Sequence, residues 1–320
     1  MVIDLGAKMD KIPAMRPGIT LNAPCKINLH LRILNRRGDG FHPIESVFVP
    51  LDFGDTLSVS LSSIGTNRVH LENRSFGEDV IPQETNLVYR AAELFCEKTA
   101  FKGRFETELV KRVPAGAGLG GGSSDAAAAL KAFNTLAGNP LDRDALALLA
   151  LELGSDVPFF LYGQSAWVTG RGEIIEPLPY RGDMGVVLVF PGFSSDTAGA
   201  YRLLDARSDG AGTPGNREAI LDGFKDLSSG KKAFPFQNDF LPLFLQDKTR
   251  GPVYAGILDV LEKSDCLFAG LSGSGSACFG LYADPDKALQ AEKRLWRIRN
   301  GCRVKSTFFL ACETKGMYNL

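Results

Sequence analysis

Residues 114–125 read Pro114-Ala115-Gly116-Ala117-Gly118-Leu119-Gly120-Gly121-Gly122-Ser123-Ser124-Asp125, and this glycine-rich stretch decides the fold. A β-like segment (105–113) precedes it, and a strong helix former (126–133) follows it. Free amides at a helix N-terminus carry partial positive charge, and glycines let the backbone approach an anion. Ser123 and Ser124 are suitable helix caps and can also donate hydroxyl hydrogen bonds. The stretch therefore predicts a phosphate-binding loop, with a tight strand-to-helix turn and a capped helix as the alternative.

Two common phosphate-binding motifs do not fit this loop. A Walker A loop needs a lysine after its second glycine, and no lysine follows these glycines. Three of the glycines (Gly116, Gly118 and Gly121) satisfy the dinucleotide pattern G-x-G-x-x-G, but any glycine run contains that pattern. The acids about 20 residues further on, Asp142 and Asp144, open another predicted helix instead of ending a strand. A dinucleotide-binding fold is therefore disfavoured.

Length and composition limit the class of protein. At 320 residues, with 44% apolar and 23% charged residues, the chain is expected to form two globular domains. The net charge of −1 and the lack of a basic run argue against a nucleic-acid partner. No apolar stretch is long enough to span a membrane, and the start resembles neither a signal nor a transit peptide. Six dispersed cysteines and three histidines disfavour a zinc site or disulfide framework, so we expect a protein of the reducing cytoplasm. No obligate protein partner is evident from the sequence.

Residues 20–34 alternate between apolar and polar, which predicts a half-buried strand. One predicted face carries Leu21, Ala23, Cys25, Ile27, Leu29, Leu31 and Ile33. The other presents Lys26, Asn28 and His30 in a row, either to solvent or to a ligand.

The glycine-rich stretch resembles the nucleotide loop of the GHMP kinase superfamily, P-x-x-x-G-L-G-x-G-S-S-D/N-A-A. Its triple glycine followed by Ser-Ser-Asp most resembles the 4-diphosphocytidyl-2-C-methyl-D-erythritol kinase family. Other motifs of that family occur in the right order between residues 20 and 312. They are Ala-Pro-Cys-Lys-Ile-Asn-Leu (23–29), Arg-Gly-Asp-Gly-Phe-His (37–42), Thr-Asn-Leu (85–87), Gly-Ser-Asp-Val-Pro-Phe-Phe (154–160) and Leu-Ser-Gly-Ser-Gly (271–275). Phe41 departs from the tyrosine common in the family, which keeps base stacking but removes a phenol hydrogen bond.

The resemblance implies an α+β, two-domain GHMP kinase fold. The N-terminal domain would be ribosomal protein S5 domain 2-like, and the C-terminal domain ferredoxin-like. We expect an extension over residues 1–19, an ATP-binding and catalytic domain over 20–182, and the second domain over 183–320. The second glycine-serine loop (268–280) is expected to close the phosphate site from the other domain.

The reaction that the resemblance implies is phosphorylation by ATP, with Mg²⁺, of the 2-hydroxyl of 4-diphosphocytidyl-2-C-methyl-D-erythritol, a small molecule of the non-mevalonate isoprenoid route. Catalysis would rest on Lys26 and Asp156, although Asp156 could simply cap the following turn. ATP would be bound by Pro114, Ala115, Gly116, Ala117, Gly118, Leu119, Gly120, Gly121, Gly122, Ser123, Ser124, Asn86 and Leu87. The substrate would be bound by Asn28, Phe41, His42, Thr197 and Tyr201, and no residue is assigned as a metal ligand. The alternatives are another GHMP small-molecule kinase and a non-catalytic nucleotide-binding module of the same fold.

Overall fold

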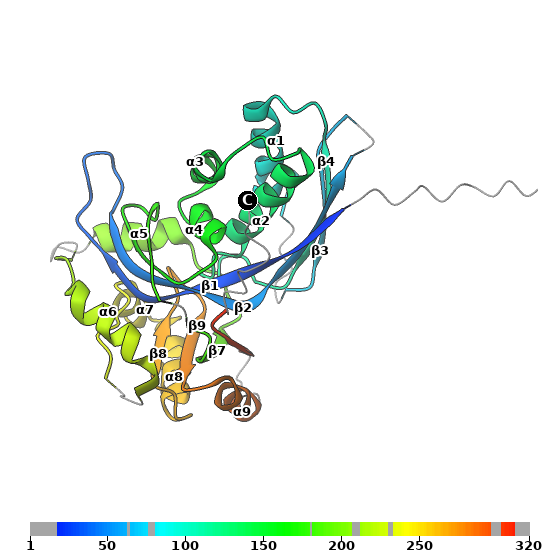
Figure 1. Cartoon of the computed structure of the whole chain (residues 1–320). Coiled ribbons are helices and arrows are strands. Elements are labelled where there is room, and N and C mark those ends of the chain that lie inside the picture. Colours follow the sequence, from blue (N-terminus) through cyan, green and yellow to red (C-terminus); the bar gives the residue numbers. More distant parts are fainter. Residues whose placement is uncertain are drawn as a thin grey trace, which may run out of the picture.

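The computed structural model describes residues 18–62, 65–75, 81–179, 181–206, 212–229, 233–295 and 302–310. The chain forms two sheets, each accompanied by helices (Figure 1). The predicted extension over residues 1–19 lies almost wholly outside the described residues. The strands of the first sheet are β1 (Ile19–Ile33), β2 (Ile44–Leu61), β3 (Arg68–Asn73), β4 (Phe105–Lys111), β5 (Ala166–Thr169) and β6 (Ile174–Pro177).

The first sheet is built around the 18-residue strand β2. Antiparallel β1 pairs with β2 over nearly its whole length. On the other edge of β2, β4 pairs with its second half and β5 with its beginning. The strand order is β3-β4-β2-β5-β6, with β1 also paired to β2, and β3 runs parallel to β4. Because β2 reaches from β5 to β4, it links the glycine-rich loop after β4 to the turn after β5.

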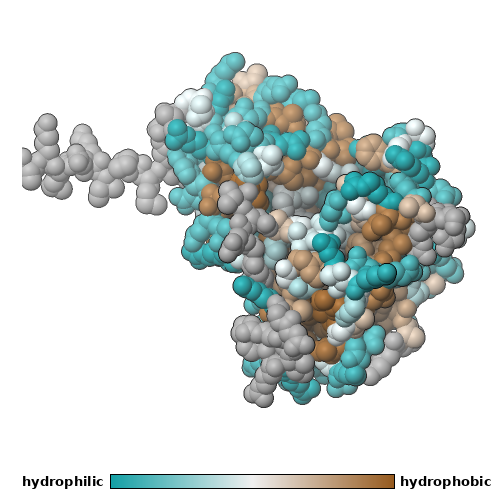
Figure 2. All heavy atoms as spheres, turned by 180° about the vertical axis from the view of Figure 1, so that it is seen from behind, coloured by the Kyte–Doolittle hydropathy of each residue, from teal (hydrophilic) through white to brown (hydrophobic). Residues whose placement is uncertain are grey.

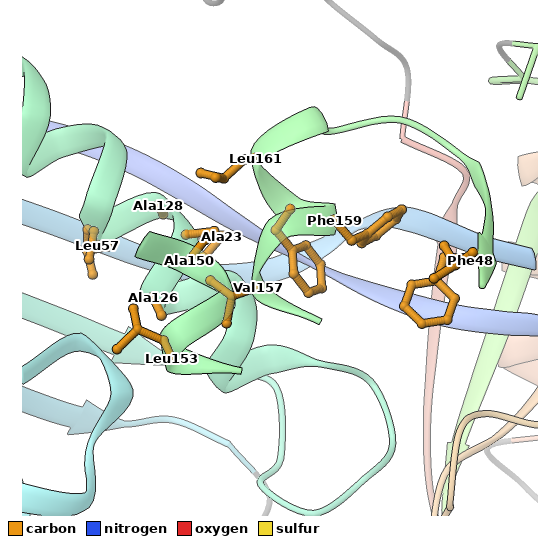
Figure 3. Close-up of a cluster of buried hydrophobic side chains, with 14 of the residues drawn as sticks. Ala23, Phe48, Leu57, Ala126, Ala128, Ala150, Leu153, Val157, Phe159 and Leu161 are labelled. Atoms are coloured by element: carbon orange, nitrogen blue, oxygen red, sulfur yellow. The ribbon is translucent and has the colours of Figure 1, made fainter. Parts of the chain in front are cut away.

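Four helices cover one face of this sheet (Figure 1). Four successive alanines (Ala126–Ala129) lie buried in the second helix, and their small size lets this helix approach β1 and β2 closely. Figure 3 shows the resulting core, in which Phe159 meets Phe48 of β2 edge-on at 5.1 Å between ring centroids. The four helices are α1 (Leu87–Thr99), α2 (Gly121–Leu136), α3 (Arg143–Leu153) and α4 (Val157–Tyr162).

Two shifts of register between β1 and β2 correct the prediction of one apolar and one polar face. The register shifts between Pro24 and Lys26 and again between Asn28 and His30. Such irregularities interrupt the strict alternation of sides along a strand. Cys25, Ile27 and Leu29 accordingly pack in a different apolar cluster from Ala23, Leu31 and Ile33. Lys26 and Asn28 therefore face the helices, whereas His30 stacks on Trp167 on the opposite side, with 6.3 Å between ring centroids.

The second sheet has the order β10-β7-β9-β8, and all its neighbours are antiparallel. β7 and β8 flank β9, which gives the split β-α-β arrangement of the predicted ferredoxin-like domain. The boundary at residues 182 and 183 stays a prediction. The strands are β7 (Gly185–Phe190), β8 (Phe268–Leu271), β9 (Cys278–Tyr282) and β10 (Arg303–Phe308), and the helices are α5 (Thr197–Asp205), α6 (Arg217–Lys225), α7 (Leu241–Leu245), α8 (Gly251–Glu262) and α9 (Pro285–Leu295).

The two sheets share an apolar core. Cys25, Ile27 and Leu29 of β1 cluster with Val186 and Leu188 of β7. In the rear view, hydrophilic residues form most of the outer rim, and apolar residues show between them toward the middle (Figure 2). Among the described helices, none has the length and apolar character needed to cross a membrane.

Candidate active site

A cavity of about 400 Å³ lies where the glycine-rich loop, β1 and the second domain meet. The glycine-rich loop contributes residues 114–123 to its wall. One group of lining residues, including Asn86 and Leu87, comes from the start of α1. Another group comes from elements far away in sequence: Lys26, Asn28, Asp156, Arg171, Thr197, Tyr201, Gly273 and Ser274. The cavity therefore gathers the predicted ATP-binding and catalytic residues at one place.

The glycine-rich loop needs glycine for its conformation and for close packing. Gly116, Gly118 and Gly120 have φ angles of +65°, +75° and +69°, which other residues rarely adopt. A Cβ atom on Gly118 would lie 2.1 Å from the carbonyl oxygen of Ser272. The loop therefore has room for backbone but not for side chains where it meets the second domain.

The helix that follows the loop begins earlier than the sequence suggests. Its N-cap is Gly120, without a side-chain cap, and the predicted capping by Ser123 or Ser124 is wrong because both lie inside the first turn of α2. Ser123 lines the cavity, but Ser124 is buried, does not line it, and its hydroxyl has no hydrogen-bond partner among the described residues. The amides of the first turn remain free of helical partners and are available to an anion.

The second glycine-serine loop packs on the first, as predicted. The Ser272 hydroxyl donates to the carbonyl of Gly118 at 2.9 Å, and the amide of Ala277 donates to the carbonyl of Ala117 at 3.0 Å. The amide of Asn28 in β1 donates to the Ser272 hydroxyl at 3.2 Å. These bonds fix the glycine-rich loop against β1 and the second domain.

Lys26 and Asp156 form an ion pair at the cavity wall, with 3.6 Å between Nζ and Oδ2. The ammonium group also donates to Asn28 Oδ1 at 2.5 Å and to the carbonyl of Gly118 at 3.2 Å. Burial lowers the pKa of Lys26 below its usual value, although the charge of Asp156 opposes this shift. The lysine is therefore a buried cation that connects the carboxylate to the glycine-rich loop.

Asp156 is held at the beginning of α4 by its buried neighbours Val157, Pro158 and Phe159. Its side chain makes no cap hydrogen bond to α4, so the capping alternative from the sequence is wrong. The carboxylate is about one-third exposed (32%) and lines the cavity. Its place between a buried ammonium group and an open cavity suits a group that accepts a proton.

The predicted base-binding residues form a cluster beside the cavity. The rings of His42 and Tyr201 stack with 5.6 Å between centroids, and Tyr201 and Thr197 line the cavity. Burial, and to a lesser degree Asp156, raises the pKa of Tyr201 to about 12. Phe41 is 51% exposed and, like His42, does not line the cavity.

Both ring nitrogens of His42 are engaged within the protein. Nδ1 lies 2.9 Å from the carbonyl oxygen of Leu34, and Nε2 lies 2.8 Å from a carboxylate oxygen of Asp205. The polar edge of the ring is therefore occupied, and its face, stacked with Tyr201, is the part turned to the aromatic cluster. Asp205, at the end of α5, was not predicted, because its contact joins residues 163 positions apart.

The other group that sequence reasoning missed is a buried ion cluster beneath the glycine-rich loop. Lys111 lies 2.6 Å from Asp125 and contacts Asp55 as well. Burial raises the pKa of Asp125 to about 8, although Lys111 opposes the shift. Lys111 and Asp125 line the cavity, and Asp125 stands in the quoted glycine-rich stretch, where it could have been noticed.

At the α1 end of the cavity, Asn86 is the N-cap of α1. The Asn86 side chain accepts a hydrogen bond from the amide of Val88 at 2.9 Å. This bond uses Asn86 Oδ1 for the helix, while Asn86 and Leu87 still line the cavity. Both predicted residues are therefore at the site.

Comparison with known proteins identifies the family. The GHMP kinases N terminal domain model matches residues 86–164, and the GHMP kinases C terminal model matches residues 219–299. A 4-diphosphocytidyl-2-C-methyl-D-erythritol kinase from Solibacter usitatus is 39% identical over 85% of this chain and 83% of its own length. One from Treponema pallidum is 38% identical over 88% of this chain and 97% of its own.

The chain belongs to the GHMP kinase family, in its 4-diphosphocytidyl-2-C-methyl-D-erythritol kinase branch. A crystal structure of 4-(cytidine 5'-diphospho)-2C-methyl-D-erythritol kinase is similar to this GHMP kinase with a TM-score of 0.73 and 34% identity, covering 92% of this chain and all of the other. Homoserine kinase from Cytophaga hutchinsonii, at 19% identity and a TM-score of 0.63, shares the fold. The two-domain GHMP kinase fold predicted from the sequence is thus confirmed.

Proposed function

We propose that this GHMP kinase transfers the γ-phosphate of ATP to the 2-hydroxyl of 4-diphosphocytidyl-2-C-methyl-D-erythritol, in non-mevalonate isoprenoid precursor biosynthesis. The observation that carries the proposal is the Lys26–Asp156 pair, which lines the same cavity as the glycine-rich loop. A nucleotide-binding module would need the loop but not a buried ammonium group beside a carboxylate that is one-third exposed to the cavity. The relatives that are named as 4-diphosphocytidyl-2-C-methyl-D-erythritol kinases support this choice of acceptor.

Asp156 is the proposed general base. A tertiary alcohol is a weak nucleophile, and its proton passes to the Asp156 carboxylate as the hydroxyl oxygen bonds to the γ-phosphorus. The bond from the γ-phosphorus to the bridging oxygen of ADP breaks in the same displacement. General-base catalysis contributes about 10²–10⁴ in rate, and most of the remaining catalysis of phosphoryl transfer comes from positioning and charge stabilisation. Lys26 supplies such a charge, because it lies 3.6 Å from the base and donates to the loop.

The glycine-rich loop is the proposed phosphate-binding group. Gly121, Gly122 and Ser123 begin α2, where amides lack helical partners and the helix dipole favours an anion. Asn86 and Leu87 line the other end of the cavity and are the proposed contacts of the adenosine group.

Mg²⁺ is proposed to arrive with ATP, whose phosphate oxygens and bound waters are its preferred ligands. The hydroxyl of Ser123 lines the cavity in the first turn of α2, and this oxygen donor suits such an ion. When bound, the ion would offset the charge of the phosphates. We assign no protein carboxylate as its ligand.

The substrate-binding residues are proposed to divide between two tasks. Asn28 Oδ1 accepts from Lys26, and its side-chain amide donates to Ser46 at 3.0 Å. Because it adjoins Lys26 in the cavity wall, Asn28 is the proposed contact of the acceptor hydroxyl. Thr197, Phe41, His42 and Tyr201 are the proposed contacts of the cytidine group, for which aromatic faces are suitable stacking surfaces. The five described cysteines are free thiols, which supports a reducing compartment such as the cytoplasm.

The test is ADP formation from ATP with a panel of alcohols that includes the cytidine diphosphate sugar-alcohol, homoserine and mevalonate. We expect turnover with the cytidine-bearing acceptor at least a hundredfold faster than with the others. Turnover only with another acceptor would show a different GHMP kinase. ATP binding without any turnover would show a nucleotide-binding module.

A further inference from the structure

Arg171 is a cation in the cavity wall that has no role in the mechanism proposed above. It lines the cavity together with Asp156 and Tyr201. The two other cations in the cavity wall are neutralised, because Lys26 faces Asp156 at 3.6 Å and Lys111 contacts two aspartates. Throughout the described ranges, no carboxylate lies within 4.0 Å of the Arg171 guanidinium. Arg171 therefore offers the cavity an uncompensated positive charge.

The turn that carries Arg171 is fixed by contacts with two other segments of the chain, one near His42 and one near Asp156. Its turn joins β5 to β6, and Gly170 and Gly172 have φ angles of +70° and +129°. The carbonyl of Gly170 accepts from the amide of Ile44 at 2.7 Å, which attaches the turn to the strand that follows Phe41 and His42. A Cβ atom on Gly172 would lie 3.2 Å from that of Ser155, so the turn also packs beside Asp156. The carboxylate of Glu173 accepts from the Arg171 amide, and so Glu173 fixes the turn without neutralising the guanidinium.

The side chain of Arg171 reaches from the cavity to the aromatic cluster. Its guanidinium carbon lies 4.3 Å from the centroid of the Phe41 ring. A cation over an aromatic face is attracted to it, which orients the guanidinium. The protein thus presents an aromatic group, then a cation, then the base Asp156.

The proposed substrate has its groups in the same order. A cytidine base is followed by two anionic phosphates and then by the alcohol that receives the new phosphate. If the base lies by Phe41 and Tyr201 and the hydroxyl by Asp156, then the diphosphate must pass between them. The only cation that this part of the described cavity wall offers there without a carboxylate partner is Arg171.

We propose that Arg171 binds the diphosphate of the nucleoside diphosphate-linked acceptor and selects for acceptors that carry it. This inference rests on the proposed function and adds to it the residue that recognises the phosphates. A guanidinium can donate two parallel hydrogen bonds to phosphate oxygens, which a lysine cannot reproduce. Arg171 is thus a specificity-determining residue, and it takes no part in proton transfer.

The test measures the dissociation constants of CDP and of cytidine by calorimetry, for the full chain and for Arg171→Gln. The wild type should bind CDP more tightly than cytidine. The variant should lose about tenfold to a hundredfold in CDP affinity, as expected for charge-assisted hydrogen bonds, with less than a threefold change for cytidine. In the kinase assay, KM for the cytidine diphosphate sugar-alcohol should rise by a similar factor, with kcat and KM for ATP nearly unchanged. Arg171→Lys should recover part of the CDP affinity.

Arg143→Gln is the matched control, because Arg143 also lies over an aromatic ring, at 4.5 Å from the centroid of Tyr162, but outside the cavity wall. Its ratio of CDP to cytidine affinity should equal that of the wild type. An equal loss for cytidine and CDP in Arg171→Gln would mean that Arg171 only supports Phe41, and would overturn the proposal. An unchanged ratio in a wild-type-active kinase would also overturn it and leave the proposed function intact. If the wild type neither binds CDP nor phosphorylates the acceptor, both the proposed function and this inference are wrong.

Discussion

Replacing Lys26 by methionine keeps the side-chain length and removes the charge that stabilises the reacting oxygen. At an effective dielectric constant of about 20, two unit charges 3.6 Å apart interact by about 4.6 kcal/mol. Because Asp156 is one-third exposed, solvent screening reduces this value to about 2–4 kcal/mol. If the transition state loses that much stabilisation, kcat should fall by roughly 30- to 900-fold.

The assay is ADP formation at saturating ATP and acceptor. Methionine also leaves Asn28 Oδ1 and the Gly118 carbonyl without their donor, at a cost of about 1–3 kcal/mol each, so unfolding by urea must be measured in parallel. Lys131→Met is the control, because Lys131 is a partly buried lysine of this domain, donates to the Phe160 carbonyl at 3.0 Å and does not line the cavity. It should lose stability but keep kcat within about threefold of the wild type.

The pH dependence of kcat gives an independent readout. The active form of Lys26 is charged, and its pKa is lowered by burial, so activity should decline on the alkaline side at a pH below the 10.5 of an ordinary lysine. The reasoning is refuted if Lys26→Met stays within threefold of the wild-type kcat, or if the variant retains the same alkaline decline.

Three further predictions concern the loop, the ion cluster and the aromatic group. Gly118→Ala should destabilise the fold by about 2–4 kcal/mol and abolish ATP binding, because its Cβ would clash with the Ser272 carbonyl at a φ of +75°. Gly256→Ala in α8, whose Cβ would meet nothing within 4 Å and which lies outside the cavity wall, should leave calorimetric ATP binding unchanged, and equal effects of the two changes would contradict the loop geometry. Asp125 has a raised pKa in the folded state, so it holds a proton that the unfolded chain releases, and its contribution to stability is lost as pH rises toward about 8. The free energy of unfolding in urea should therefore drop between about pH 4 and about pH 8 in the wild type and drop less in Asp125→Asn, whereas parallel pH profiles would show that Asp125 is ionised throughout. Tyr201→Leu should raise KM for the cytidine-bearing acceptor by about tenfold while KM for ATP stays constant, and a rise in KM for ATP alone would place Tyr201 at the wrong end of the cavity.

The glycine-rich loop could be predicted because its chemistry is local. A run of glycines between a strand and an alanine-rich helix has few other uses, and the structure places this run at the cavity. The start of the helix was misjudged by a few residues, because glycine itself can serve as the N-cap when the loop needs a positive φ.

The two register shifts between β1 and β2 could not be predicted from β1 alone. Alternation of apolar and polar residues continues through both of them, and only the pairing with β2 shows that the faces change. The consequence matters for the site, because Lys26 and Asn28 face the cavity while His30 faces Trp167. In that buried place, desolvation and then Arg32 lower the pKa of His30 to about 4, which keeps it neutral.

Residues that act through distant contacts were also missed. Asp205 meets His42, and Arg171 meets Phe41, only after the two domains and the turn after β5 come together. Neither residue stands in a pattern that a single sequence reveals. The resemblance to a family supplied the catalytic pair, but the partners that orient the substrate end required the fold.

The most direct test of the account is the turnover of Asp156→Asn, in which an amide of the same shape cannot accept the proton of the acceptor hydroxyl. Because Asp156 makes no cap bond to α4 and is held by its buried neighbours, the fold should persist. The account predicts that kcat for ADP formation with 4-diphosphocytidyl-2-C-methyl-D-erythritol falls by about 10²–10⁴, while the dissociation constant of ATP changes by less than threefold. A variant that retains near-wild-type kcat would contradict the assignment of Asp156 as the base.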